Sequence, residues 1–217
     1  ASGIGASVAR HFAAAGAQLY LVDRDAEQLP PLAAAVGAAW QVLDVTDERA
    51  LRESVQRCVQ HYGGLDGVVS NAGTAPQGRI AQCSTAELER SLRINLLSHH
   101  WLASAAVSVM QAQGFGGFLT FNASKSAWNP GPDFGAYAIP KAALIALMKQ
   151  YALEAAAFQI RSNAVNADRV RTALLDSEDI AQRARARGLS PDAYYRANLL
   201  AREVSADDVA AAFLHLA

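Results

Sequence analysis

The chain has 217 residues, of which 52% are hydrophobic and 18% are charged, and its formal net charge at pH 7 is -1. This length is enough for one substantial α/β domain with a buried core, and it is too short for two domains of full size. No basic stripe stands out that could follow a phosphate backbone. The balance of charges is therefore that of a globular enzyme without a nucleic-acid partner.

The most apolar long segment of the chain, residues 134–158, is interrupted by charged side chains. It therefore predicts a buried helix, and we expect no membrane span. The two cysteines, Cys58 and Cys83, lack CxxC spacing, which favours a reducing compartment over a disulfide framework. The first residues do not have the pattern of a signal peptide, so we expect a cytoplasmic protein.

Apolar runs alternate with helical periodicities, and this rhythm predicts an α/β fold with a doubly wound, Rossmann-like parallel sheet in a single domain, 1–217. In chain order, the predicted elements are a helix at 4–15, a strand at 18–22, a helix at 26–35, a strand at 39–43, a helix at 47–62, a strand at 67–70, one or two helices within 85–113, a strand at 118–121, a helix at 135–158, a strand at 161–165 and a last helix starting near 206.

Two regions interrupt this rhythm. Residue 1 falls within a glycine loop and residue 217 within a helical pattern, so we expect the domain to be truncated at both ends. The segment at about 172–204 is polar and helical and follows the last predicted strand. Because ligands of open α/β sheets lie beyond the carboxyl ends of the strands, this segment is expected to form a lid over the substrate.

The first predicted helix opens with Ser2, Gly3, Ile4 and Gly5, and Asp23 follows the next strand about twenty residues later. Glycines let a backbone approach a pyrophosphate, and a helix N-terminus offers it N–H groups and a positive dipole end. A carboxylate at the end of that strand can accept both hydroxyls of an adenosine ribose. Together these features indicate a dinucleotide-binding site.

Two alternatives to this interpretation stay open. The glycine pair can be a plain tight turn, and Asp23 can serve as a cap for the helical segment that begins at Asp25. The type of dinucleotide is also open. Asp23 would repel a 2′-phosphate, which favours NAD, whereas the guanidinium of Arg24 can fold over such a phosphate, which keeps NADP possible.

Tyr137 and Lys141 are four residues apart in a helical pattern, so their side chains lie one turn apart on the same face. A phenol is a poor base at neutral pH, and a nearby ammonium lowers the phenol pKa because it favours the phenolate. Ser124 follows a predicted strand thirteen residues before Tyr137, where its hydroxyl can hold a substrate oxygen against Tyr137. The three residues together indicate proton transfer at an alcohol or a carbonyl.

Over nearly its whole length the chain resembles the short-chain dehydrogenase/reductase family. Besides the residues above, the resemblance includes Asn95 within a helical segment. It implies that Tyr137 is the acid/base, that Lys141 binds the nicotinamide ribose and tunes Tyr137, that Ser124 orients the substrate and that Asn95 completes a proton relay. The implied activity is an NAD(P)-dependent oxidoreductase that interconverts a secondary alcohol or polyol and a carbonyl.

The resemblance also extends the set of expected cofactor residues. Asp44 and Val45 match the pair that lies against the adenine, and Asn71, Ala72 and Gly73 follow the central strand. The complete set of expected cofactor residues is Ser2, Gly3, Ile4, Gly5, Asp23, Asp44, Val45, Asn71, Ala72, Gly73, Tyr137, Lys141 and Thr172.

Two positions depart from the family pattern. Asp168 stands in a turn where the family usually has a Pro-Gly pair, although Thr172 remains available for the cofactor carboxamide. Lys125 follows Ser124, either as an extra cation at the mouth of the site or as a solvated loop lysine. These departures, together with the segments at 130–134 and 198–204, resemble the dehydrogenase half of bifunctional class II aldolase/short-chain dehydrogenase proteins. That subgroup implies a covalently linked aldolase domain upstream and small sugar-derived aldehydes, ketoses or polyols as substrates.

Other polar clusters receive a structural interpretation. His99 and His100 are adjacent on a predicted helix and point about 100° apart, so no metal site is expected. Three arginines in the lid segment could meet a phosphorylated sugar, but a solvated helix face is the favoured interpretation. They are Arg183, Arg185 and Arg187.

Three further expectations concern assembly and activity. By resemblance, the protein is expected to form a homo-oligomer through its long helices. The alternative function is a non-catalytic dinucleotide sensor or scaffold, because a fold does not dictate an activity, and the departure at Asp168 is its best support. A chain that lacks the first strand and half of the phosphate loop could also be inert by itself.

Overall fold

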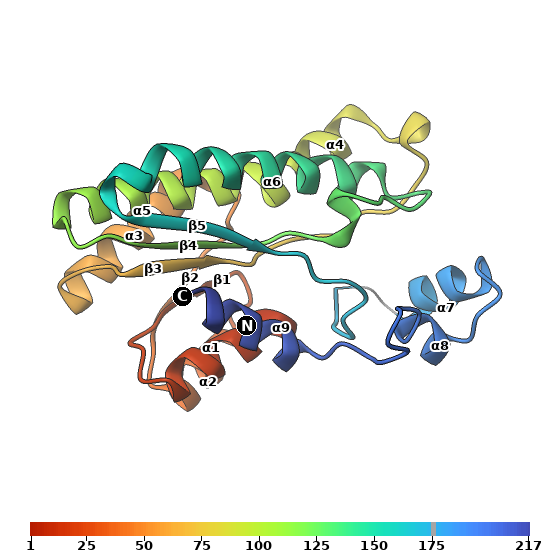
Figure 1. Cartoon of the computed structure of the whole chain (residues 1–217), viewed down its shortest axis with the longest axis horizontal. Coiled ribbons are helices and arrows are strands. Elements are labelled where there is room, and N and C mark those ends of the chain that lie inside the picture. The colour runs from red at the N-terminus through yellow and green to blue at the C-terminus, as the bar shows by residue number, and fades with distance from the viewer. Residues whose placement is uncertain (175–176) are drawn as a thin grey trace.

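Parallel strands and helices alternate in the computed structural model, which describes residues 1–174 and 177–217 (Figure 1). The strands are β1 (Tyr20–Asp23), β2 (Ala39–Val42), β3 (Gly67–Ser70), β4 (Gly117–Asn122) and β5 (Ile160–Val165). The helices are α1 (Gly3–Ala14), α2 (Leu29–Val36), α3 (Glu48–Tyr62), α4 (Thr85–Leu92), α5 (Ser98–Gln113), α6 (Gly135–Ala155), α7 (Ser177–Arg185), α8 (Pro191–Tyr195) and α9 (Ala206–Leu216).

The predicted elements are present with small shifts at their ends. The helix expected at 26–35 begins only at Leu29, because the Asp25 carboxylate accepts backbone N–H groups of Glu27 and Gln28 and holds a turn there. The region 85–113 contains α4 and α5, joined by a π-helical turn at Arg93–Leu97 that the sequence pattern did not predict. Such turns occur frequently at functional sites.

The parallel strands form two separate groups in the described part of the chain. β1 pairs with β2, and β3, β4 and β5 pair in that order. Between the two groups lies a cavity of about 990 Å³, whose walls include Leu21 of β1, Val69 of β3 and Phe12 of α1. The predicted α/β fold with parallel, Rossmann-like strands and helices on both faces is confirmed, with no pairing between β1 and β3 among the described residues.

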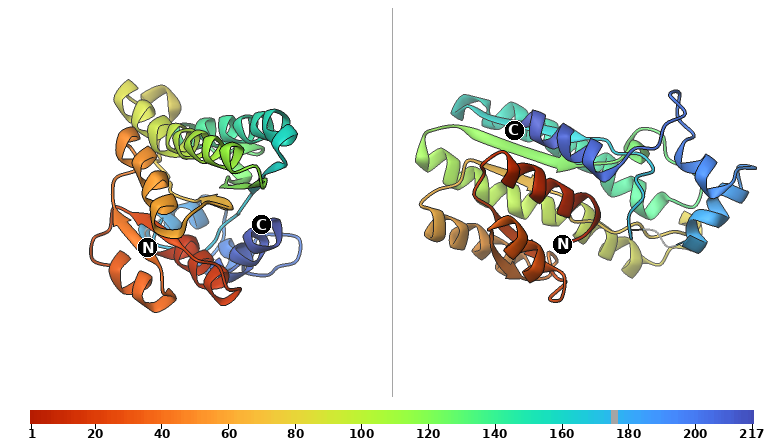
Figure 2. Two further views of the ribbon diagram at one scale, coloured as in Figure 1. Left: turned by 90° about the vertical axis from the view of Figure 1, so that its left-hand side faces the viewer. Right: turned by 90° about the horizontal axis from the view of Figure 1, so that it is seen from below.

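Helices cover both faces of the strands. Figure 1 shows α5 and α6 along one face of β3, β4 and β5, and α1, α2 and α9 on the opposite side. α9 packs against α1, and the right-hand view of Figure 2 shows the two helices side by side. Phe213 of α9 is fully buried in a cluster with Val8 and Phe12 of α1, which fixes the helix that carries the glycine loop.

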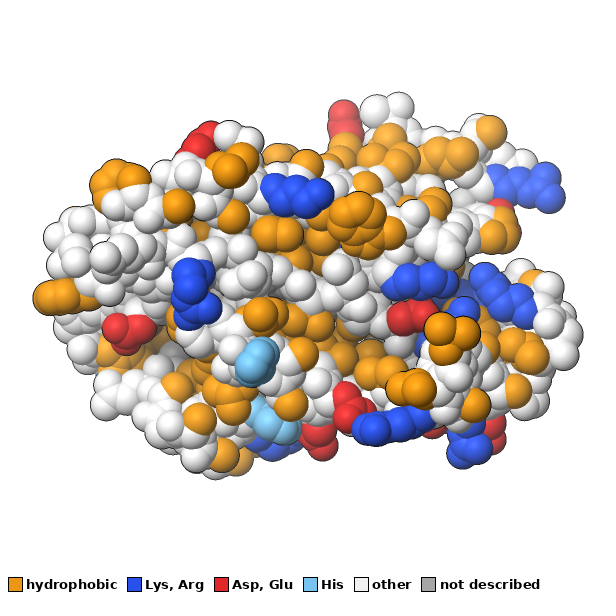
Figure 3. All heavy atoms as spheres, in the orientation of Figure 1, with side chains coloured by type: hydrophobic (Ala, Val, Ile, Leu, Met, Phe, Trp, Pro, Cys, Tyr) orange, Lys and Arg blue, Asp and Glu red, His pale blue; other side chains and the backbone are white. Residues whose placement is uncertain are grey.

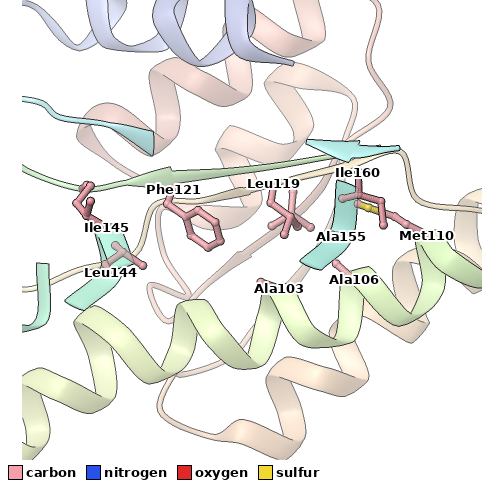
Figure 4. Packing of buried hydrophobic residues seen from close by; sticks show 11 residues of the cluster. Ala103, Ala106, Met110, Leu119, Phe121, Leu144, Ile145, Ala155 and Ile160 are labelled. Atoms are coloured by element: carbon pink, nitrogen blue, oxygen red, sulfur yellow. The ribbon is translucent and has the colours of Figure 1, made fainter. Parts of the chain in front are cut away.

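The largest hydrophobic cluster lies between β4 and the two long helices (Figure 4). Leu119 and Phe121 of β4 are completely buried, and Ala103 and Ala106 of α5 are small enough to let that helix approach the sheet closely. Full burial of a side chain such as Leu119 contributes about 1.5–3 kcal/mol of hydrophobic free energy. This packing fixes the end of β4, from which the candidate site is built.

The segment expected to form a lid contains α7 and α8, which lie beyond the carboxyl ends of β4 and β5 (Figure 1). Ile180 and Ala184 of α7 pack on Tyr194 and Tyr195 of α8 in a small core of their own. Residues 175–176 of the predicted segment 172–204 lie outside the described residues. Among all the helices in residues 1–174 and 177–217, none is both long and apolar enough to cross a membrane.

Candidate active site

A cavity of about 430 Å³ opens where the strands end. Of the expected cofactor residues, all but one line it: Ser2, Gly3, Ile4, Asp23, Asp44, Val45, Asn71, Ala72, Gly73, Tyr137, Lys141 and Thr172. The exception is Gly5, which lines the neighbouring cavity between the two strand groups. Residues that are far apart in the sequence are therefore brought to a single groove.

At its two glycines, the loop at the start of α1 has little room for a side chain. A Cβ added to Gly3, whose φ is +51°, would lie 3.0 Å from Cγ2 of Thr172, and one added to Gly5 would lie 2.9 Å from Nδ2 of Asn71. The side chain of Ser2 makes no capping hydrogen bond, and the first N–H groups of a helix have no partner within it. This end of the groove therefore fits a pyrophosphate.

Two carboxylates lie at the ends of β1 and β2. Asp23 accepts the Asp25 N–H at 3.0 Å through Oδ1 and contacts the Ala1 amino group through Oδ2. Asp23 therefore caps the start of the segment at Asp25, as the alternative expected, and the Asp25 carboxylate holds the next turn before α2. The same Asp23 carboxylate also lines the groove. Asp44 accepts the Thr46 N–H at 2.9 Å, and this hydrogen bond lowers the pKa of its carboxyl.

The side chain of Lys141 is enclosed beneath the groove. Its Nζ donates to the backbone carbonyl of Asn122 at 2.7 Å and lies 5.8 Å from the centre of the Tyr137 ring. Because burial disfavours the charged form, the pKa of Lys141 falls to about 7. The Asn122 amide in turn donates to Oδ1 of Asn71 at 2.7 Å, so Asn122 links the lysine to the loop after β3.

Tyr137 lies next to Ser124, and its environment has two opposing effects. Burial raises the pKa of the phenol, whereas the hydrogen bond with Ser124 and the positive charge of Arg183 lower it. The net effect is an increase, so the lowering of the phenol pKa expected from Lys141 alone is not found. Burial outweighs the nearby positive charge at this position.

Asn95 is completely buried in the π-helical turn between α4 and α5. Its Nδ2 donates to the Thr74 carbonyl and to Oγ of Ser91, both at 3.0 Å, and its Oδ1 accepts the Thr74 N–H at 3.1 Å. A Cβ added to Gly73 would lie 3.1 Å from that oxygen and 3.7 Å from Nζ of Lys141. Asn95 and Lys141 therefore face each other across the backbone of Gly73.

Thr172 lines the groove, whereas Ser124 lies next to it, after Ala123. The Ser124 side chain is nearly buried, and its Oγ accepts the N–H of Ser126 at 3.1 Å in the short turn that follows β4. The turn with Asp168 is held without a glycine, because Arg169 takes a positive φ of 51° and donates to the Ala197 carbonyl. Thr172 consequently still reaches the glycine loop.

The two adjacent histidines have separate structural partners. His99 is completely buried, and its Nδ1 lies 2.7 Å from Oγ of Ser70. Burial, together with the charge of Lys141, lowers its pKa well below the usual value. His100 hydrogen-bonds with the Tyr151 hydroxyl at 3.0 Å. Among the described residues, no group of three potential ligands could hold a metal ion.

Comparisons with known proteins agree with this geometry. A family model described as enoyl-(acyl carrier protein) reductase matches residues 1–217. The 4-formylbenzenesulfonate dehydrogenase TsaC1/TsaC2 of Comamonas testosteroni is 37% identical over 175 residues, which are 76% of this chain and 68% of that protein. The crystal structure of levodione reductase superimposes with a TM-score of 0.91 at 26% identity, covering 99% of this chain and 86% of the other.

The chain belongs to the short-chain dehydrogenase/reductase family. As a member, it is an NAD(P)-dependent oxidoreductase that acts on alcohols and carbonyls. A longer relative is the uncharacterized oxidoreductase YuxG of Bacillus subtilis (strain 168), which is 30% identical over the whole of this chain. The chain spans only 33% of the length of YuxG.

Sequence reasoning missed two residues of this short-chain dehydrogenase/reductase site. Asn122 ends β4 beside Asn71 at the end of β3, so its place in the row of strand ends is a signal that could have identified it. Arg183 contacts the site from α7 and was interpreted as part of a solvated face. No local pattern could have placed it, because its position depends on how the segment with α7 and α8 packs on the rest of the domain.

Proposed function

We propose that Ser124, Tyr137 and Lys141 carry out the proton transfer of a reaction between a secondary alcohol and a carbonyl. The observation that carries the proposal is that Tyr137 and Lys141 line the cofactor groove, while the Ser124 side chain lies close enough to Tyr137 to lower the pKa of its phenol. Bound NAD(P) supplies the hydride acceptor for oxidation and the hydride donor for reduction.

Ser124, Tyr137 and Lys141 each have a separate role in the proposed proton transfer. In oxidation, Ser124 holds the substrate hydroxyl, and the Tyr137 oxygen accepts its proton while the C–H bond breaks and the C=O bond forms. In reduction, Tyr137 returns the proton to the carbonyl oxygen. Lys141 is buried and its pKa is about 7, so it can take up and release a proton beside Tyr137 at neutral pH.

Asn95 and the loop of residues 71–73 complete the site in this proposal. Asn95 fixes the backbone beside Lys141 and supports the proton relay through water. The cofactor is held at its pyrophosphate by Ser2, Gly3, Ile4 and Gly5, and at the adenosine by Asp23, Asp44 and Val45. Asn71, Ala72, Gly73 and Thr172 hold its nicotinamide end.

Three further proposals concern a substrate lid, the subgroup of the family and the oligomeric state. The place of α7 and α8 beyond the strand ends supports residues 172–204 as a lid over the substrate within a single domain, 1–217. The match to a third of YuxG supports a larger protein, for which the sequence suggests an upstream aldolase domain and small sugar-derived substrates. Exposed apolar side chains on α6, such as Leu153, support a homo-oligomer.

Replacement of the phenol hydroxyl tests the proposed proton transfer. The Tyr137→Phe variant is expected to lose turnover of a panel of aldehydes and ketones, because it cannot exchange the proton. Its affinity for NADH, measured by fluorescence titration, should stay within about twofold of the original protein. Retained turnover in this variant would contradict the assignment of Tyr137.

A further inference from the structure

Arg183 of α7 lies next to Phe134, the residue before α6, close to the tyrosine of the candidate site. Its guanidinium carbon is 3.8 Å from the centre of the Phe134 ring, and its Nε donates to Oε1 of Gln77 at 3.1 Å. Phe134 in turn meets Tyr137 edge to face, with ring centres 5.7 Å apart. The guanidinium is thus one aromatic ring away from the tyrosine proposed as acid/base.

One of the guanidinium nitrogens of Arg183 has no acceptor among the described residues, although Tyr194 and Asp179 act on the guanidinium as a whole. Its Nη2 is enclosed and has no hydrogen-bond partner there, and none of the ion pairs in that part of the chain includes Arg183. A buried N–H without an acceptor is costly, and more so when it carries charge. Burial accordingly lowers the pKa of Arg183, although Tyr194 and Asp179 oppose this effect.

A second cation reinforces the positive charge at this position. Arg187 donates from Nη1 to the Arg183 carbonyl at 3.1 Å, and its charge contributes to lowering the pKa of Arg183. The same arginine approaches the opposite loop, since a Cβ added to Gly131 would lie 3.4 Å from its Nη2. Figure 3 shows Lys and Arg side chains, with Asp and Glu side chains among them, where α7 and α8 meet the rest of the domain, and Arg183 is in none of the ion pairs among the described residues of this region. An anion entering the site from this end would be attracted.

We propose that Arg183 binds an anionic group of the substrate, a carboxylate or a similar oxyanion, while Ser124 and Tyr137 hold the reacting oxygen. The enclosed Nη2 would donate a charge-assisted hydrogen bond to this group, and the stack on Phe134 keeps the guanidinium plane fixed for it. The substrate class is therefore an oxo or hydroxy acid whose acid group is remote from the reacting carbon. This inference rests on the proposed function, and it adds the substrate class.

The test compares aldehydes that differ only in charge. The pairs are 4-carboxybenzaldehyde with its methyl ester, and succinic semialdehyde with its methyl ester, each reduced with NADH. The original protein should prefer an acid over its ester by roughly tenfold to a hundredfold in kcat/KM. Arg183→Met should abolish this preference, mainly through a higher KM for the acid. Because the charge of Arg183 also lowers the pKa of Tyr137, the variant can change both rates by a common factor, so the ratio of acid to ester measures the anion contact.

Two variants serve as controls. Arg183→Lys retains the charge without the planar fork of donors, so it should keep part of the preference. Arg185→Met removes an exposed arginine from the same helix and should behave as the original protein. Equal thermal unfolding midpoints of all variants exclude a loss of fold.

The possible outcomes separate the two proposals. Equal kcat/KM for acid and ester, or a preference that survives in Arg183→Met, overturns the role of Arg183. If the protein reduces none of the aldehydes, the proposed function is contradicted. The role of Arg183 is then tested separately, by measuring the binding of an anion. Calorimetric titration of the NADH-loaded protein with benzoate then supports the site if Arg183→Met weakens binding tenfold or more. Equal binding in both proteins, or no binding to the original one, overturns it.

Discussion

The ammonium of Lys141 donates to the backbone carbonyl of Asn122 at 2.7 Å and is otherwise enclosed by the folded chain. One carbonyl does not replace the water that an ammonium loses on burial, which is why its pKa falls from 10.5 to about 7. Lys141, proposed to tune the acid/base, is therefore a source of instability in the protein without cofactor.

The first prediction concerns how stability varies with pH. Between pH 7 and 10.5 the unfolded chain binds a proton at Lys141 that the folded chain has released. The free energy of unfolding should therefore rise with pH in this window, by up to about 1.4 kcal/mol per pH unit, while below pH 7 the full cost of the buried charge remains. Urea unfolding at several pH values measures this contribution as the difference between the original protein and Lys141→Met.

Lys149→Met is the matched control for this experiment, because Lys149 is an exposed lysine on the same helix. It should leave the pH dependence unchanged. If the free energy of unfolding varies with pH in the same way in Lys141→Met and in the original protein, then burial does not lower the pKa of Lys141 in the folded chain, and the prediction is wrong.

The second prediction concerns Asn95 and the loop after β3. Asn95→Ala removes the partners of both backbone groups of Thr74, and an unpaired buried group costs about 1–3 kcal/mol. We expect a loss of about 2–4 kcal/mol in the free energy of unfolding. Ser98→Ala is the control, since Ser98 is equally buried but makes only one local bond, to the Ile94 carbonyl. A loss no larger than that of the control would show that Asn95 does not hold the loop.

The sequence predicted those parts of the site that depend on local geometry. The spacing of Tyr137 and Lys141 needs only a helix, and Asp23 needs only a strand that ends where it does. The carbonyl partner of Lys141 depends on how α6 packs on β4, which no local pattern specifies. The position of Arg183 likewise depends on the fold of the lid.

In the fold, too, features that depend on local sequence were predicted and features that depend on packing were not. Periodicity predicted the strands and helices because each buries one face, but the π-helical turn at Arg93–Leu97 has no signature in the spacing of apolar residues. Helix starts shifted where side chains compete for backbone N–H groups, as Asp25 does before α2. The gap between β1 and β3 concerns strand pairing, which a pattern of single strands does not specify.

The last prediction concerns the choice between NAD and NADP. Asp23 ends β1 in the groove, where its negative charge would repel a 2′-phosphate, while Arg24 in the same groove would attract it. If the carboxylate dominates, the original protein binds NADH more tightly than NADPH. Asp23→Asn keeps the shape and removes the charge, so it should lower the ratio of the two affinities about tenfold or more.

Fluorescence titration with both cofactors measures this ratio as two Kd values. Asp25→Asn is the control for net charge, because the Asp25 carboxylate is already engaged by the N–H groups of Glu27 and Gln28. It should change both Kd values little and in the same proportion. An original protein that prefers NADPH, or an equal change of the ratio in both variants, would show that Arg24 and not Asp23 decides the cofactor.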